Sequence, residues 1–175
     1  MGSNKALLPF GHGLTFAGHL VNCFGIYGCN PVVLVVNDQP GTDHLKQANL
    51  ITVVNHRVDL GRTYSIRLGL NQVPPGFACV IHNVDNPYLE PDILDRLLEM
   101  LQPDTFVVPV HEGRGGHPVL LGSHVADHIR SQDHPADFRE MLGLFQRVEL
   151  PCRDEGILWN INTPGEYQRF IRGFR

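Results

Sequence analysis

The chain of 175 residues is long enough to bury one hydrophobic core, and its content of 42% apolar and 8% aromatic residues argues against a disordered or fibrous protein. No apolar stretch approaches the roughly 20 residues of a membrane helix, and a formal net charge of -4 gives no support to nucleic-acid binding. The first residues are polar and turn-forming, so we expect no signal peptide and a cytoplasmic protein with one domain over residues 1–175.

Short apolar runs alternate with helical patterns along the chain, and this order is typical of an α/β protein with a parallel sheet covered on both faces. The runs that predict strands are bounded by Gly, Pro or Asn and span residues 31–37, 50–54, 77–83, 105–110 and 119–121. Helical spacing of apolar side chains predicts helices over residues 15–27, 91–101 and 163–171. The last helix opens on Thr163, Pro164 and Glu166, which form a capping box.

Five segments carry the residues with chemical potential, and they occur in the order MGSNKALLPFG (from residue 1), GRTYSIRLGL (61), ACVIHNVDNPYLEPDIL (78), GRGGHPVLLG (113) and ILWNINTPGEY (157). Together they resemble the signature of the MobA-like NTP transferase family, the molybdenum cofactor guanylyl- and cytidylyltransferases. The resemblance implies a three-layer α/β/α Rossmann-like fold of the nucleotide-diphospho-sugar transferase (GT-A-like) type, with a mostly parallel sheet. It also implies an enzyme that uses Mg²⁺ to transfer a nucleotide from CTP or GTP to a phosphorylated acceptor such as molybdopterin.

The resemblance assigns the nucleotide side of the site to three residues. Lys5 matches the lysine that holds the triphosphate, and an ammonium group is a suitable point charge beside a polyanion. Gly61 would let the backbone approach the nucleotide, and Ser65 would offer a hydroxyl group. Arg67, in the same segment, fits an ordinary solvated helical side chain as well as a functional one.

A carboxylate at the end of a predicted strand is the expected metal ligand of the site. Asp85 follows the run at residues 77–83, and ligands of open α/β sheets bind beyond the carboxyl ends of the strands. Carboxylate oxygen suits Mg²⁺, and the resemblance gives Asp85 that catalytic role. Asn160 and Asn162 match the closing motif of the family and should lie close to Asp85, with Asn162 as a second metal ligand.

The acceptor side follows from the resemblance alone. His117, in the Gly-His-Pro segment, would face the phosphorylated acceptor, and Asn160 would bind it as well. Arg139 lies in the run Asp-Phe-Arg-Glu-Met-Leu from residue 137, which is similar to a helix whose arginine reaches the acceptor phosphate.

The chain departs from the family pattern at its start, because family members begin with an apolar strand and a glycine-rich loop that are missing here. The first strand is central in a doubly wound sheet, so its absence predicts two unpaired strand edges inside the core, at about 1–3 kcal/mol for each buried unpaired group. Three explanations stand: the sequence starts at an internal methionine, the protein is shortened and repaired by rearrangement or dimerisation, or it is a relic that no longer binds nucleotide.

Other functions compete with the transferase. A non-catalytic accessory protein that binds the cofactor or a molybdoenzyme would keep the fold without the chemistry, and a homodimer or molybdoenzyme partner is left open. The ten histidines include His82, His111 and His117, but they form no His-Glu-x-x-His motif of a metalloprotein. Residues 11–13 (Gly-His-Gly) lack the third glycine of a dinucleotide-binding loop. The cysteines (Cys23, Cys29, Cys79 and Cys152) lack zinc-site spacing, and we expect structural thiols.

Overall fold

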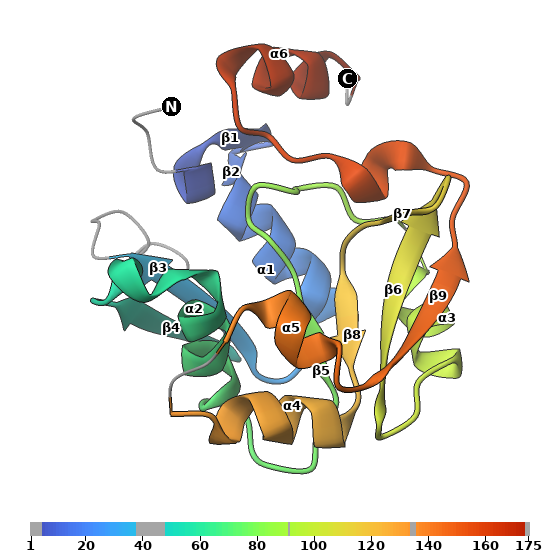
Figure 1. Cartoon of the computed structure of the whole chain (residues 1–175). Helices are drawn as coiled ribbons and strands as arrows, with labels where there is room; N and C mark the ends of the chain where they lie inside the picture. Colours follow the sequence, from blue (N-terminus) through green and yellow to red (C-terminus); the bar gives the residue numbers. More distant parts are fainter. Residues whose placement is uncertain (1–4, 38–47, 91, 134–135, 174–175) are drawn as a thin grey trace.

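The computed structural model describes residues 5–37, 48–90, 92–133 and 136–173 (Figure 1). The α-helices are α1 (Phe16–Ile26), α2 (Gly61–Leu70), α3 (Ile93–Glu99), α4 (Ser123–Ser131), α5 (Phe138–Leu142) and α6 (Pro164–Gly173). The strands are β1 (Pro9–Gly11), β2 (Leu14–Thr15), β3 (Val32–Asn37), β4 (Leu50–Asn55), β5 (Cys79–Ile81), β6 (Thr105–His111), β7 (Arg114–Gly115), β8 (Val119–Leu121) and β9 (Gln146–Pro151). Short 3₁₀ helices are η1 (Lys5–Leu7), η2 (Val58–Leu60) and η3 (Glu155–Leu158).

The predicted elements are present in the structure, with shifted ends. The strand expected over residues 77–83 is confirmed only as the three residues of β5. The helix expected from residue 91 begins at Ile93, and Pro91 lies outside the described residues. Thr15 caps α1 by accepting a hydrogen bond from the Gly18 amide, so the helix expected from residue 15 begins at Phe16.

The described strands form three sheets, and the expectation of one mostly parallel sheet was wrong. Strands β3 and β4 pair in parallel, whereas β5, β8, β6 and β7 pair antiparallel in that order, with β9 parallel to β6. The tight turn at Glu112 and Gly113, both with positive φ, reverses the chain between β6 and β7 and so fixes an antiparallel pair. The sheet is divided because β3 and β5 do not pair with each other.

Helices cover both faces of the strands β6 and β8. Helices α2, α4 and α5 pack on one face, where the buried strand residues are Phe106, Val108 and Leu121. Helices α1 and α3 pack on the other face, against Val107 and Leu120. Alternate residues of β6 therefore serve opposite sides, which explains its continuous apolar sequence and why this run was recognisable as a strand. None of the described helices is long and apolar enough to cross a membrane.

The Gly11–Gly13 segment is the turn of the small hairpin formed by β1 and β2 (Figure 1). Gly11, His12 and Gly13 all have positive φ, a backbone conformation that favours glycine in tight hairpin turns. The glycines therefore serve a turn that joins two strands, which is a different setting from the strand-to-helix loop of a dinucleotide site.

Candidate active site

Three side chains from distant parts of the chain meet at one point. Lys5, at the start of η1, places its Nζ 3.2 Å from Oδ2 of Asp85 and 2.5 Å from Oδ1 of Asn162. The side chains of Lys5 and Asp85 retain 32% and 27% of their exposure, so the cluster is neither sealed in the core nor fully solvated. A cation held by two oxygens at a partly open surface can receive an anionic ligand from the open side.

The backbone around Asp85 is held by the C-terminal segment. The Ile161 amide donates a 2.7 Å hydrogen bond to the carbonyl of Asp85, and the Ile161 side chain is buried against Phe16 and Phe170. Asn86, which has no exposed surface, donates from Nδ2 to the carbonyl of Ile157 at 3.0 Å. The aspartate is therefore fixed by contacts with residues more than 70 positions away in sequence, as a site that depends on geometry requires.

The predicted capping box also holds Asn162. Oε2 of Glu166 accepts hydrogen bonds of 2.8 Å from the amides of both Asn162 and Thr163, and the Thr163 hydroxyl accepts one from the Glu166 amide at 3.2 Å. These amide donors lower the pKa of the Glu166 carboxyl group. The start of α6 thus fixes the backbone from which the Asn162 side chain reaches Lys5.

Asn160 does not join this cluster in the way that the sequence predicted. Its side chain is exposed, and its hydrogen bond within the described residues runs from Nδ2 to the carbonyl of Leu158 at 3.3 Å. Ile161 points into the core, so its two neighbours Asn160 and Asn162 both lie on the outer side of an extended segment, but Asn162 is the one in contact with Lys5.

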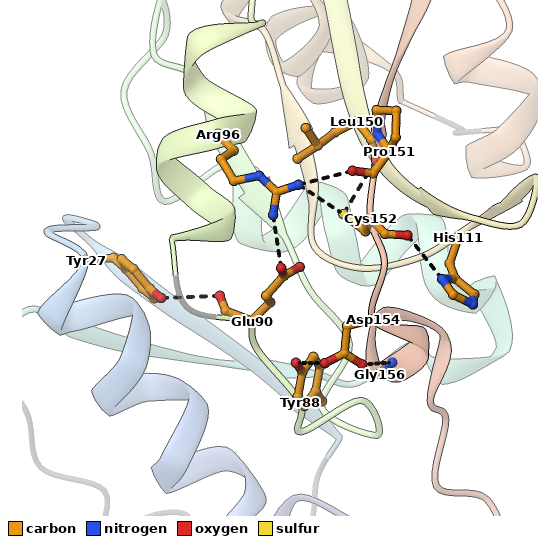
Figure 2. A network of polar contacts seen from close by, with 10 residues as sticks. All are labelled: Tyr27, Tyr88, Glu90, Arg96, His111, Leu150, Pro151, Cys152, Asp154 and Gly156. Carbon is orange, nitrogen blue, oxygen red and sulfur yellow. Dashed lines mark hydrogen bonds and ion pairs between the residues drawn. The ribbon is translucent and has the colours of Figure 1, made fainter.

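A network of polar contacts anchors the loop that follows Asp85 (Figure 2). Arg96 bonds Oε1 of Glu90 at 3.0 Å and the carbonyl of Pro151 at 3.1 Å, which ties α3 and the loop to the end of β9. The Tyr88 hydroxyl donates to Asp154, whose other oxygen accepts a bond from the Gly156 amide. Burial and the neighbouring carboxylate raise the pKa of Tyr88, which keeps its hydroxyl protonated as a donor.

Two histidines lie behind the loop, and both are neutral at pH 7. Burial lowers the pKa of His82 to about 3, and burial together with the positive charge of Arg62 lowers that of His117 to about 4. Nε2 of His82 donates to the carbonyl of Asn86 at 2.7 Å, and Nε2 of His117 accepts from Nδ2 of Asn83 at 3.0 Å. His117 therefore carries no charge, and its Nδ1 is enclosed and has no hydrogen-bond partner within the described residues.

The Gly61 segment forms the N-terminal part of α2, as the sequence predicted. Gly61 has a φ of 74°, a backbone conformation that side-chain-bearing residues rarely adopt. The Ser65 hydroxyl accepts a 2.8 Å hydrogen bond from Nδ2 of the buried Asn55 at the end of β4. No hydrogen bond or ion pair among the described residues joins Gly61 or Ser65 to Lys5 or Asp85, although Ser65 lines the same cavity as the residues that lead up to Asp85.

Arg62 is a further candidate for the site, and the sequence reasoning missed it. Loss of solvation lowers the pKa of its guanidinium group, and the charge of Asp85 is the next influence, followed by those of Arg139 and Asp137. The guanidinium carbon lies 5.5 Å from the ring centroid of Phe138, and no hydrogen bond or ion pair ties the group within the described residues. An arginine that is within electrostatic range of Asp85 and free of a fixed partner is available to a phosphate.

The two arginines considered in the sequence analysis, Arg67 and Arg139, lie outside the Lys5 cluster. Arg67 donates from Nη1 to the carbonyl of Asp133 at 2.7 Å, so it connects α2 to the segment after α4 and does not face the cluster. Arg139 is exposed on α5 and lies near enough to Arg62 for the two charges to repel. The position of Arg62 right after Gly61 in the motif was the available signal, but a single helical arginine gives no indication of its neighbours in space.

The set of donors near Lys5 limits the metal that the site can take. Within the described residues, no group of three or more His, Cys, Asp and Glu side chains is arranged to hold an ion. Asp85 and Asn162 provide one carboxylate and one amide oxygen, which are hard ligands of the kind that Mg²⁺ uses together with water and substrate phosphates. The residues present fit a cation that is shared with a bound triphosphate.

The sequence has relatives among known proteins. The family model of the MobA-like NTP transferase domain matches residues 1–149. The molybdenum cofactor cytidylyltransferase of Escherichia coli (strain K12) is 25% identical over 171 residues, which cover 95% of this chain and 86% of the relative.

Solved structures share the fold at low identity. Rv0371c of Mycobacterium tuberculosis H37Rv, in a complex with manganese, has a TM-score of 0.75 at 20% identity, over 98% of this chain and 93% of that one. Molybdopterin-guanine dinucleotide biosynthesis protein A of Archaeoglobus fulgidus has a TM-score of 0.69 at 19% identity, over 99% and 91%. With a family match over most of its length and this α/β fold, the chain belongs to the MobA-like NTP transferase family of nucleotidyltransferases.

Proposed function

We propose that this protein transfers a nucleotidyl group from a nucleoside triphosphate, CTP or GTP, to the phosphate of a small acceptor such as molybdopterin, with release of pyrophosphate. The observation that carries the proposal is the convergence of Lys5, Asp85 and Asn162 at one partly open point. The names of the relatives from Escherichia coli and Archaeoglobus fulgidus support the acceptor, since both refer to the molybdenum cofactor or molybdopterin.

The reaction needs no nucleophile from the protein. An oxygen of the acceptor phosphate attacks the α-phosphorus, a new P–O bond forms, and the bond from the α-phosphorus to the bridging oxygen breaks. That oxygen leaves on pyrophosphate together with the bonding electrons, so no proton has to move. Catalysis is then positioning and charge neutralisation, the terms that dominate phosphoryl chemistry.

Lys5 is proposed to supply the charge on the triphosphate. Its ammonium group is held by Asp85 and Asn162 in the free protein, and a phosphate oxygen that approaches from the open side would share or displace these contacts. When bound, Mg²⁺ would withdraw negative charge from the phosphates, and Asp85 and Asn162 are the residues that would hold it. Gly61 and Ser65 are proposed to line the nucleotide.

Arg62 is proposed to bind phosphate between the nucleotide and the acceptor. Its charge interacts with those of Asp85, Arg139 and Asp137, which supports a position close to residues proposed for both substrates. His117, neutral and partly buried, would contribute a hydrogen bond to the acceptor. Arg139 and Asn160, both exposed, stay proposals for the outer edge of the acceptor site.

Incubation of the chain with CTP or GTP, molybdopterin and Mg²⁺ tests the function through the release of pyrophosphate. We expect release when all three components are present, and a marked excess with one of the two nucleotides. If nucleotide and Mg²⁺ change neither the pyrophosphate signal nor the thermal midpoint, the protein is the non-catalytic accessory protein instead.

A further inference from the structure

The two oxygens that would hold a metal ion are already joined by a cation of the protein itself. Nζ of Lys5 lies 3.2 Å from Oδ2 of Asp85 and 2.5 Å from Oδ1 of Asn162. Mg²⁺ binds its oxygen ligands at about 2.0–2.1 Å and would use these same two atoms. A metal that bridges the two oxygens therefore needs the place that the ammonium group takes in the free protein.

The oxygens extend from a fixed backbone, whereas the cation is at the end of a flexible side chain. The carbonyl of Asp85 accepts a 2.7 Å hydrogen bond from the Ile161 amide, and the Asn162 amide donates one of 2.8 Å to Glu166. The side chain of Lys5 is a long flexible stem of which 32% remains exposed. A rearrangement of the cluster would therefore move the lysine and leave the two oxygens in place.

The backbone of Lys5 is anchored beside the strand end that leads to Asp85. The Leu8 amide donates a 3.1 Å hydrogen bond to the carbonyl of Lys5 across η1. Ala6, the next residue, is buried in the small cluster against which Val84 packs. The ammonium group can therefore swing toward the open side without loss of η1, and it stays within reach of a phosphate bound next to Asp85.

The charges around Asp85 oppose a further cation in the free protein. Asp85 carries one negative charge, and the described positive groups that act on it include Lys5, at 3.2 Å, and Arg62. A divalent ion next to Lys5 would be repelled, because like charges a few ångströms apart interact strongly in a partly buried site. A bound triphosphate changes this balance, since its oxygens offer both cations a partner and add negative charge beside the metal.

We propose that Lys5 is a placeholder cation, which takes the position of the divalent metal between Asp85 and Asn162 in the free protein and leaves it when a triphosphate binds. The inference rests on the proposed function, because it concerns the metal and the nucleotide of the same site. The free protein then has a low affinity for divalent metal, and metal and nucleotide strengthen each other's binding. The lysine thus couples the two ligands and keeps the oxygens closed to metal in the absence of nucleotide.

Binding of Mn²⁺ to the intact chain without nucleotide, measured by electron paramagnetic resonance of the free ion, tests the placeholder role. Lys5→Met keeps a long side chain but removes the charge, so it should bind Mn²⁺ roughly tenfold or more tightly than the wild type. Lys5→Ala should show the same gain. Lys5→Arg keeps a cation at the two oxygens and should bind Mn²⁺ as weakly as the wild type.

Two further variants show whether the gained metal binds at the cluster. Addition of Asp85→Asn to Lys5→Met should abolish the gain, because it removes the carboxylate on which the metal depends. Arg57→Met is the matched control, since Arg57 also forms an ion pair with a carboxylate, at 2.8 Å from Asp59, but on an exposed surface. Its loss should leave the affinity for Mn²⁺ unchanged, because a solvated carboxylate alone holds a metal weakly.

The α,β-methylene analogues of CTP and GTP, which bind without turnover, test the coupling. Either or both should raise the affinity of the wild type for Mn²⁺ by roughly tenfold or more above that for the metal alone. The relaxation rate of water protons distinguishes metal bound to the protein from metal bound to nucleotide in solution. In Lys5→Met, the nucleotide should produce a smaller increase, because the metal position is already open.

Three results would overturn the proposal. Equal affinities of the wild type and Lys5→Met for Mn²⁺ without nucleotide would show that the ammonium group does not hold the metal position. An undiminished gain after the addition of Asp85→Asn would place the metal elsewhere. Failure of both analogues to raise the affinity of the wild type would remove the coupling. Pyrophosphate release decides the proposed function separately: release by a wild type with the same Mn²⁺ affinity as Lys5→Met would leave the function standing without the placeholder.

Discussion

The ammonium group of Lys5 lies 2.5 Å from the amide oxygen of Asn162, although 157 positions separate the two residues in sequence. The same group lies 3.2 Å from Asp85, so the start, the middle and the end of the chain contribute one side chain each to a single cluster. Its exposed side is where we place the triphosphate, and this arrangement leads to four predictions.

Replacement of Asp85 by Ala should reduce pyrophosphate release by roughly 10²-fold or more, because a carboxylate beside the phosphates is lost from an organised electrostatic site. Lys5→Ala should have an effect of similar size through loss of the cation. Asp95→Ala, which removes an exposed carboxylate from α3, is the matched control and should retain full activity. Release of pyrophosphate with saturating nucleotide measures all three, and a fully active Asp85→Ala enzyme would remove this residue from the site.

Asn160 and Asn162 form a matched pair of exposed amides in one segment. Asn162→Ala removes a contact with Lys5 and should raise the KM for the nucleotide and lower kcat, by about tenfold for a hydrogen bond to a charged group. Asn160→Ala leaves the Lys5 contacts intact, so its effect should be confined to the KM for the acceptor. Steady-state kinetics with each substrate varied in turn separate the two. Equal defects toward the nucleotide would contradict the distinction.

Arg62→Ala should weaken substrate binding by roughly ten- to a hundredfold, the value of a charge-assisted hydrogen bond to phosphate. Arg62→Lys should recover part of the loss, because it restores the charge without the fork of donors. Arg114→Ala, at an exposed position of β7, provides the control. Titration with nucleotide and with acceptor identifies which phosphate Arg62 contacts, and unchanged affinity for both would leave it with a structural role.

The two neutral histidines should make the protein less stable in acid. The pKa values of His82 and His117 in the folded chain, about 3 and about 4, lie below the ordinary value of 6.5, so the unfolded chain binds more protons in between. Their contribution is complete above pH 6.5 and is lost as the pH falls toward 4. For His117, the shift corresponds to about 3 kcal/mol.

Thermal midpoints of the wild type and of His117→Gln, measured between pH 7 and pH 4, check this effect. The variant carries no group that titrates in this range, so its midpoint should fall less steeply with acid. Parallel curves for His117→Gln and the wild type would show that His117 is not held neutral by burial.

Local patterns in the sequence were sufficient for much of the fold. The continuous apolar runs of β3 and β6 and the capping box at Thr163 and Glu166 were recognisable because hydrophobic periodicity and caps depend on residues within a few positions of each other. Strand β9 was missed, because the charged Arg147 and Glu149 interrupt its apolar pattern. The short amphipathic helix α4 was missed as well.

The candidate site was predicted in part. The motifs identified Lys5, Asp85 and Asn162 and their approach to one another, because the carboxyl ends of strands meet at one edge of a sheet and the motif order follows that of the family. The sequence did not distinguish Asn162 from Asn160, and it passed over Arg62.

Only the tertiary structure decided the surroundings of the site residues, and with them their charge and their partners. Whether His117 is charged depends on burial and on Arg62, which lies 55 positions before it, and whether Arg62 is tied or available depends on which side chains surround it in space. The division of the sheet between β3 and β5 likewise follows from which edges meet after folding. Secondary structure depends mainly on residues that are close in sequence. The pKa values, the hydrogen-bond partners and the pairing of strands depend on residues that come close only in the folded chain.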